Sequence, residues 1–402
     1  METLVVAPGT APTSARMASA SLPRLLDLQI LRALAASLVV LDHIFLSLNA
    51  VGIPDQQFLN PASLMGHFGV TAFFVLSGLI MVRQSTDLFG VPHSPVQFLY
   101  RRITRIVPMY WIATLVWLLI GGAGHPQHRV LQVFNSLFFI PNSLAADGRL
   151  DPLLQSGWTL NYEMGFYVLF ALALFLPRRT GIVAILITLQ GLIALGHSYT
   201  SPQSPATLLS FYTSPIVIYF AYGVLVGLLE TEFRPIARIT FPISPAFLLV
   251  LPAVAMLGFP GLFASAPLWD LLGFYAFIVV ILCSIANQPS PGRLTQAFAR
   301  LGDASYCTYL FHLLLVGAVA LLVGGHLHSS HVSPALLIVI ALATVVLANL
   351  FGLFIHHFIE LRIINFFRSQ TRVPVTRAAE NPAPNHNSLN NSFAAQLELK
   401  QE

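Results

Sequence analysis

Long apolar blocks decide the fold, and the clearest of them is residues 335–355, which read ALLIVIALATVVLANLFGLFI. None of the side chains in this block is charged. At 1.5 Å per residue, a helix of about twenty residues crosses the ~30 Å hydrocarbon core of a bilayer. The block therefore predicts a membrane-spanning helix, and residues 182–195 form another block of this kind.

The composition of the whole chain agrees with this prediction. Of the 402 residues, 56% are hydrophobic and only 9% are charged, and the mean hydropathy is +0.75. In a typical soluble domain about 25% of the residues are charged. We therefore expect an all-α, polytopic integral membrane helical bundle whose partner is the lipid bilayer. The formal charge of +4 comes from arginines between apolar blocks, so it indicates topology and not nucleic-acid binding.

Ten apolar blocks bounded by Arg, Pro and Gly are long enough to span a membrane. The predicted spans are residues 25–48, 66–83, 105–121, 158–176, 181–198, 207–229, 244–263, 268–287, 304–324 and 333–358. An apolar piece at residues 130–140 is too short to cross, so we expect a re-entrant or interfacial segment there. The transmembrane domain is then residues 25–362, between disordered cytoplasmic tails at residues 1–24 and 363–402.

The basic residues predict which side of the membrane each loop faces, because cytoplasmic loops are enriched in Lys and Arg. With both termini in the cytoplasm, seventeen of the twenty basic residues fall on the cytoplasmic side. Arg129 and Arg149 fall outside, and Arg32 lies within the first span. Treating residues 130–140 as a true span would place eleven of the seventeen outside, so ten spans fit the arginines better.

Ionisable residues inside the predicted spans are the candidates for chemistry, because each costs about 2.5–3.5 kcal/mol near the bilayer centre. Arg32 and His43 share one face of the first span, roughly 16 Å apart along the helix axis. Glu163 lies in the fourth span at a depth similar to that of His43. A carboxylate paired with the imidazole would make it a stronger general base. The alternative is a buried pair that only locks two helices together.

Two arginines, Arg102 and Arg105, lie one helical turn apart at the start of the third span. The planar guanidinium donates in a fork that fits phosphate oxygens, so this pair predicts a phosphate site. The alternative is a positive-inside anchor beside an aromatic belt at Tyr110 and Trp111.

Three further polar residues lie in apolar spans. Ser77 precedes Gly78, and this small pair predicts close helix packing beside a site. Tyr309 and His312 are one turn apart in the ninth span. They are expected either to line the site or to form a buried hydrogen-bonded pair.

No metal site is predicted. Three histidines lie within residues 326–331, but no Cys or carboxylate that could complete a zinc site accompanies them. Cys283 and Cys307 are predicted to be small core residues. Glu360 and Arg362 are predicted to form an interfacial charge pair at the end of the last span.

Five sequence blocks, in this order, resemble the membrane-bound acyltransferase-3 family, whose members modify polysaccharides, lipopolysaccharide and related glycans. The blocks are LQILRALA at residues 28–35 followed by His43, GVTAFFVLSG at 69–78, RITR at 102–105 followed by Pro108, Tyr110 and Trp111, GWTLNYE at 157–163 followed by Phe166 and Tyr167, and Ser305 and Tyr306 with Tyr309, Leu310 and His312. They cover residues 28–312, and five blocks in order make the resemblance specific. The first and fourth blocks look closest to the branch associated with exopolysaccharide acylation.

The resemblance implies a multi-pass enzyme of the bacterial inner membrane. Its donor would be cytoplasmic acyl-CoA, commonly acetyl-CoA, acting as a co-substrate with no bound cofactor. Its acceptor would be an extracytoplasmic or lipid-linked carbohydrate, and polysaccharide-export machinery is an expected partner.

The family motifs also give roles to residues of this chain. They imply that His43 is essential, that Arg102 and Arg105 help to hold the donor, and that Arg32 lies beside its path. From its place in the fourth span, Glu163 is assigned to catalysis together with His43, either directly or by orienting the His43 ring. The other residues expected to line the site are Ser77, Trp158, Tyr167, Tyr309 and His312.

These residues together give a mechanistic hypothesis. CoA phosphates bind at the cytoplasmic arginines, and the thioester reaches His43, which acts as general base on the acceptor hydroxyl or accepts the acyl group itself. One alternative is a transporter or flippase for a lipid-linked glycan, whose arginines would hold a pyrophosphate. Another is an inactive scaffold in a polysaccharide-export complex. The transporter predicts no consumption of acyl-CoA.

Overall fold

The computed structural model describes residues 26–53, 56–120, 129–141, 150, 152–199, 207–232, 239–240, 243–259, 268–287, 292–326 and 332–370. Nearly all of them are helical, which confirms the all-α prediction. The α-helices are α1 (Leu26–Ala50), α2 (Gln56–Gln84), α3 (Ser94–Leu119), α4 (Arg129–Leu137), α5 (Trp158–Ala173), α6 (Arg178–Tyr199), α7 (Leu208–Tyr212), α8 (Ile218–Glu232), α9 (Val250–Gly258), α11 (Trp269–Ile285), α12 (Arg293–Asp303), α13 (Ser305–His326), α14 (Pro334–Ile355) and α15 (Leu361–Gln370).

Short elements complete the chain. Three 3-10 turns and one π-helical turn are η2 (Gln155–Gly157), η3 (Pro215–Val217), η4 (Pro245–Leu249) and the π turn η5 (His356–Glu360). The two strands, β1 (Ile239–Thr240) and β2 (Ala286–Asn287), pair in parallel over two residues each.

Seven helices in the described ranges are long and apolar enough to cross a membrane, judged by length and composition. They are Leu26–Ala50, Phe58–Gln84, Ser94–Leu119, Arg178–Tyr199, Leu208–Glu230, Ser305–His326 and Pro334–Gln370. Two shorter apolar helices are Pro245–Gly258 and Asp270–Ser284. The polytopic membrane class is therefore confirmed. The number of ten spans and the cytoplasmic position of both termini stay predictions.

Two predicted segments take less regular forms. The span expected at residues 207–229 is divided into α7, η3 and α8, because Pro215 has no N–H to continue the helical hydrogen bonds. The piece expected at residues 130–140 forms α4, which has nine residues and exposes Val130, Leu131 and Phe134. A helix of this length is too short to span a bilayer, in agreement with the prediction.

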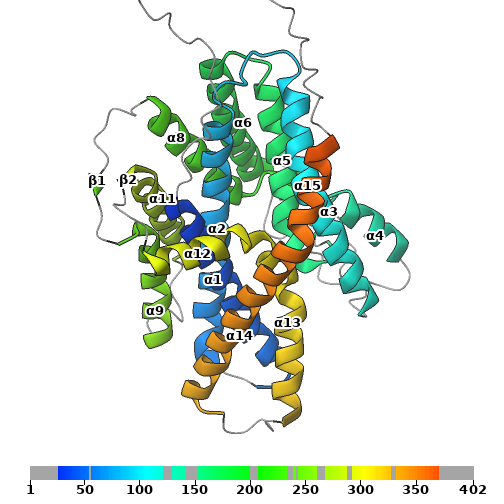
Figure 1. The fold of residues 1–402 in the computed structure, drawn as a ribbon, viewed down its shortest axis with the longest axis vertical. Coiled ribbons are helices and arrows are strands. Elements are labelled where there is room, and N and C mark those ends of the chain that lie inside the picture. Colours follow the sequence, from blue (N-terminus) through cyan, green and yellow to red (C-terminus); the bar gives the residue numbers. More distant parts are fainter. Residues whose placement is uncertain are drawn as a thin grey trace, which may run out of the picture. The chain divides into compact units, whose positions relative to one another are not determined.

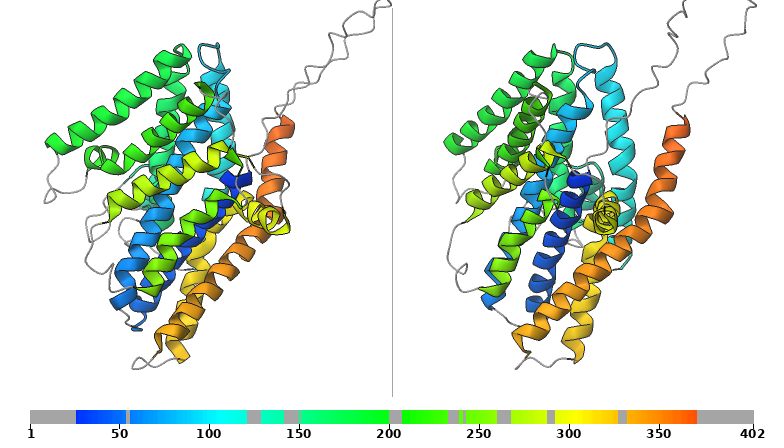
Figure 2. Two further views of the ribbon diagram at one scale, coloured as in Figure 1. Left: turned by 90° about the vertical axis from the view of Figure 1, so that its left-hand side faces the viewer. Right: turned by 60° about the vertical axis from the view of Figure 1, so that its left-hand side comes forward.

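Helices α1 and α2 run side by side through the first unit of the chain (Figures 1 and 2). Helix α1 also packs against α12 and α13, and α2 packs against α8 and α11. The contact between α2 and α8 depends on facing glycines, since a Cβ placed on Gly78 would lie 2.9 Å from the Cα of Gly223. The close packing predicted at Gly78 is thus present, and it brings Ser77 into the interior of the bundle.

Two buried features fix other helices around this pair. Arg83, at the end of α2, forms an ion pair with Glu230 of α8 at 3.2 Å, and both side chains are less than one tenth exposed. The short helix α12 lies across the direction of α1 (Figures 1 and 2). Gly302 of α12 lies so close to the backbone of Gln29 that a Cβ would overlap it. The ion pair joins α2 to α8, and the contact with α12 holds the end of α1 that carries Arg32.

The chain divides into two units, residues 1–361 and 362–402. Of the second unit the structure describes residues 362–370, which continue α15. Residues 363–370 were predicted to begin a disordered tail, but they are helical because Ile363, Ile364, Phe366 and Phe367 recur at helical spacing. The predicted tail at residues 1–24 lies outside the described residues.

Candidate functional site

One pocket in the first unit collects side chains from α1, α2, α3, α5 and α13. It contains about 830 Å³ of space, part of it open to solvent. Seven of the ten residues predicted for the site line it, namely Arg32, Ser77, Arg102, Arg105, Glu163, Tyr167 and Tyr309. Apolar side chains such as Phe73, Phe74 and Met81 complete the walls. Residues chosen by separate sequence arguments therefore meet in one place.

Positive charge dominates this pocket. Its charged lining is three guanidiniums, Arg32, Arg102 and Arg105, and one carboxylate, Glu163. Guanidiniums that converge from α1 and α3 repel one another unless an anion lies between them. The pocket therefore fits a ligand with several phosphate oxygens, combined with an apolar segment against the phenylalanines.

Arg102 is held in place by its neighbours. Its Nη2 donates a hydrogen bond to Oε1 of Gln84 at 2.7 Å. Its guanidinium lies over the rings of Phe98 and Tyr167, at 5.4 and 5.8 Å from their centroids. Its Nε is buried and has no hydrogen-bond partner within the part of the chain that the structure describes. An oriented guanidinium with an unused donor is suited to an anionic ligand.

Glu163 lines this pocket and makes its hydrogen bonds there, with residues other than His43. Its Oε1 accepts hydrogen bonds from Ser77, at 3.1 Å, and from the hydroxyl of Tyr167. The pair of Glu163 and His43 that the sequence predicted is not formed among the described residues. The two side chains lie on helices with different main neighbours, because α5 packs mainly on α3 and α6 while α1 packs mainly on α2, α12 and α13.

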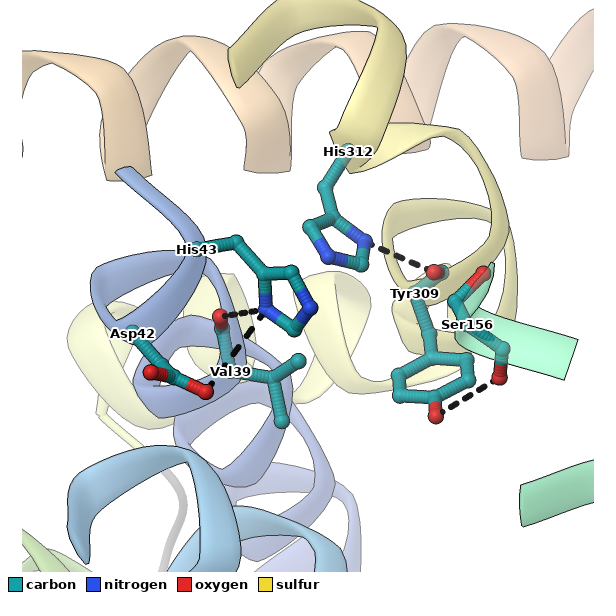
Figure 3. A network of polar contacts seen from close by, with 6 residues as sticks. All are labelled: Val39, Asp42, His43, Ser156, Tyr309 and His312. Carbon is teal, nitrogen blue, oxygen red and sulfur yellow. Dashed lines mark hydrogen bonds and ion pairs between the residues drawn. The ribbon is translucent and has the colours of Figure 1, made fainter. Parts of the chain in front are cut away.

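His43 lies on α1 beside two acceptors (Figure 3). Its Nδ1 lies 2.9 Å from the carbonyl oxygen of Val39 and 3.9 Å from Oδ2 of Asp42. A carbonyl oxygen only accepts, so we assign the proton of the neutral ring to Nδ1. Nε2 then keeps its lone pair, which is the form that a general base or a nucleophile requires.

His312 connects His43 to the arginine pocket (Figure 3). The two imidazoles meet edge to face with centroids 4.9 Å apart, and the ring of His312 lies 5.9 Å from that of Tyr309, which lines the pocket. Nδ1 of His312 contacts the carbonyl oxygen of Tyr309 at 2.7 Å, whereas Nε2 is buried without a hydrogen-bond partner in the described ranges. The Tyr309 hydroxyl donates to the carbonyl of Ser156 at 2.9 Å. Tyr309 therefore lines the site, and His312 continues it toward His43.

Trp158 takes a position apart from the pocket. It begins α5, and its ring meets Tyr162 edge to face with centroids 5.9 Å apart. It is not among the residues that line the pocket. The next residue, Thr159, does line it and shares a hydrogen bond with the Tyr309 hydroxyl at 2.6 Å. The block GWTLNYE therefore lines the pocket through Thr159 and not through Trp158.

Asp42 is a site residue that the sequence analysis missed. Its Oδ2 lies 3.9 Å from Nδ1 of His43, and its Oδ1 is buried without a hydrogen-bond partner in the described part of the chain. Gly66 of α2 faces it so closely that a Cβ would overlap the carboxylate. The signal in the sequence was an acidic residue directly before the histidine inside an apolar span.

Comparison with known proteins places the chain in a family. Residues 25–353 match the model of the acyltransferase domain of the acyltransferase-3 family. The exopolysaccharide production protein ExoZ of Rhizobium meliloti (strain 1021) is 35% identical over 264 residues, which cover 64% of this chain and 78% of that protein. The acyltransferase MdmB of Streptomyces mycarofaciens is 25% identical over 366 residues, which cover 82% of this chain and 90% of that protein. No solved structure matches the chain.

The family match extends over all the helices that build the pocket. It includes α1 with Arg32 and His43, α3 with both arginines, α5 with Glu163, and α13 with Tyr309 and His312. The match covers well over half of the chain, and the described helices are long and apolar enough for a membrane. The chain therefore belongs to the acyltransferase-3 family and is a membrane acyltransferase.

Proposed function

We propose that this chain is an enzyme of the bacterial inner membrane that transfers an acyl group, acetyl in the simplest case, from cytoplasmic acyl-CoA to a hydroxyl of a carbohydrate. The acceptor is an extracytoplasmic or lipid-linked glycan. One observation carries the proposal: a pocket with three guanidiniums adjoins, through Tyr309, the His312–His43 pair. The arginines suit the phosphates of CoA, and the histidine suits the acyl transfer.

The chemistry at His43 follows from the free lone pair on Nε2. His43 takes the proton of the acceptor hydroxyl, whose oxygen attacks the thioester carbonyl. The C–S bond then breaks, and the proton returns to the CoA thiolate to give the free thiol. In the covalent variant, Nε2 itself attacks the thioester and the C–S bond breaks, so CoA leaves as the thiolate. The acceptor hydroxyl then attacks the acyl-imidazole, the C–N bond breaks, and the hydroxyl proton passes to the thiolate to give the free thiol. Both routes use the same tautomer, in which Val39 fixes the proton on Nδ1.

The relatives support the acyltransferase class over a flippase for lipid-linked glycans. ExoZ is described as an exopolysaccharide production protein and MdmB as an acyltransferase. The first name supports a glycan acceptor, with polysaccharide-export machinery as a partner of the enzyme. The family membership supports chemistry and not transport.

The test compares surface glycans of cells with and without the gene by mass spectrometry, together with release of CoA from acetyl-CoA by the purified protein. We expect glycan esters to disappear without the gene, and we expect CoA release to depend on the protein. Unchanged ester content with no turnover of acetyl-CoA would contradict the proposal and favour the transporter.

The geometry also predicts which carboxylate supports His43. The Asp42→Asn variant replaces the carboxyl group 3.9 Å from the ring with an amide, which cannot become a carboxylate that stabilises the protonated imidazole, so we expect kcat to fall about tenfold with an unchanged KM for acetyl-CoA. Glu163→Gln disturbs the arginine pocket, so we expect its main effect on KM. Initial rates of CoA release at several acetyl-CoA concentrations measure both. A fall in kcat for Glu163→Gln alone would instead make Glu163 the partner of His43.

A further inference from the structure

A second cluster of reactive side chains lies in the first unit, and none of its members lines the arginine pocket. It consists of Cys307 on α13 and of His356 and Glu360 on the turn η5 that follows α14. Sγ of Cys307 donates to Oε2 of Glu360 at 3.1 Å, and Nδ1 of His356 lies 2.6 Å from the same oxygen. The three ligand atoms all lie within 4.8 Å of one another.

The backbone builds this cluster. Residues His356–Glu360 form a π-helical turn, a rare element that often occurs at functional sites. One turn earlier, Gly352 lies so close to α13 that a Cβ there would be 2.7 Å from the backbone nitrogen of Thr308. This close approach places Cys307 beside Glu360, and both side chains are almost completely buried. His356 is 16% exposed and gives the cluster its access from outside.

The donor set is one that divalent transition metals accept. Thiolate, imidazole and carboxylate are the three ligand types that bind zinc, and three protein ligands leave a fourth position for water. A divalent ion with one thiolate and one carboxylate has no net charge, which suits a buried site. The ion displaces the thiol proton, and the imidazole binds through Nδ1 with its own proton on Nε2.

We propose that Cys307, His356 and Glu360 bind one divalent transition-metal ion of the zinc class. The ion joins α13 to the end of α14. Tyr306, the residue before Cys307, lines the arginine pocket, so the ion fixes the wall of that pocket from behind. From the sequence, Cys307 was predicted to be a core residue and Glu360 to form a charge pair at the membrane interface. The sequence does not reveal that the π turn brings the two side chains together.

Titration of the purified full-length protein with Co²⁺, after removal of metals by a chelator, tests this site. We expect about one Co²⁺ per chain, with the visible bands of four-coordinate cobalt and a charge-transfer band from the thiolate. Cys307→Ser should remove the charge-transfer band. His356→Ala and Glu360→Gln should each weaken Co²⁺ binding at least about tenfold.

Matched controls are available in the same chain. Cys283 is the other buried cysteine, and His357 is the exposed neighbour of His356. Cys283→Ser and His357→Ala should therefore keep the cobalt spectrum and the affinity of the wild type. Absence of saturable Co²⁺ binding by the wild type would overturn the proposal, whatever the variants do. A charge-transfer band that persists in Cys307→Ser, or disappears in Cys283→Ser, would overturn it as well.

Discussion

The His43→Ala variant is expected to lose nearly all acyl transfer while it inserts and folds as the wild type does. A positioned general base contributes about 10²–10⁴-fold to the rate, and a nucleophilic histidine is no less necessary. In the described part of the chain, the His43 ring hydrogen-bonds to a carbonyl of its own helix and packs edge to face on His312, so its removal breaks no hydrogen bond between helices there. We therefore expect kcat for acetyl-CoA turnover and the ester content of surface glycans to fall together.

His326 provides the matched control for His43. It also lies on a spanning helix and makes the same contact, from Nδ1 to the carbonyl oxygen four residues earlier, at 2.7 Å. It is exposed at the end of α13 and is not among the residues of the pocket. His326→Ala should keep the wild-type rate. A His43→Ala variant with wild-type glycan ester content would disprove both the general-base and the acyl-histidine route.

Labelling with radioactive acetyl-CoA distinguishes the general-base route from the acyl-histidine route. The covalent route predicts that the wild-type protein retains labelled acetyl when acetyl-CoA is supplied without acceptor. Direct transfer to the hydroxyl predicts no such label. Either outcome leaves His43 as the reacting residue, so the large loss in His43→Ala is expected on both routes.

Much of the fold and of the pocket was predictable because polar residues are costly in apolar helices. Arg32 and Glu163 are conspicuous in blocks that are otherwise apolar, and Arg102 and Arg105 lie one helical turn apart where the third block begins; all four line the pocket. The long apolar blocks likewise predicted the helices that carry them. Such signals are local, and they depend only on which residues interrupt an apolar run.

What could not be predicted depends on which helices are neighbours. The predicted depths of Glu163 and His43 along their spans suggested that the two residues pair. Instead, Glu163 accepts hydrogen bonds from Ser77 and Tyr167, and Asp42 lies beside His43. The π turn that directs Glu360 toward Cys307 has no mark in the local sequence. Contacts across the bundle follow from close approaches such as that of Gly78 and Gly223, which one sequence does not reveal.

Replacing Arg102 by Gln is expected to raise the KM for acetyl-CoA by about ten- to a hundredfold. A charge-assisted hydrogen bond contributes about 1.5–3 kcal/mol, which corresponds to that range of affinity. Glutamine keeps a polar side chain of intermediate length but loses the charge, the fork and the contacts with the rings of Phe98 and Tyr167. Initial rates of CoA release against acetyl-CoA concentration give the KM, and kcat should change little.

A donor without phosphates separates phosphate binding from mere anchoring of α3 at the membrane surface. Acetylpantetheine carries the thioester but none of the phosphates of CoA, so Arg102→Gln and the wild type should use it equally well. Arg101, the exposed residue before Arg102, serves as control, because Arg101→Gln removes the same charge from the same turn without touching the pocket. If Arg102→Gln weakened both donors equally, or if Arg101→Gln had the same effect, Arg102 would be an interfacial anchor. A loss confined to acetyl-CoA and to Arg102→Gln identifies the pocket as the place where the donor phosphates bind.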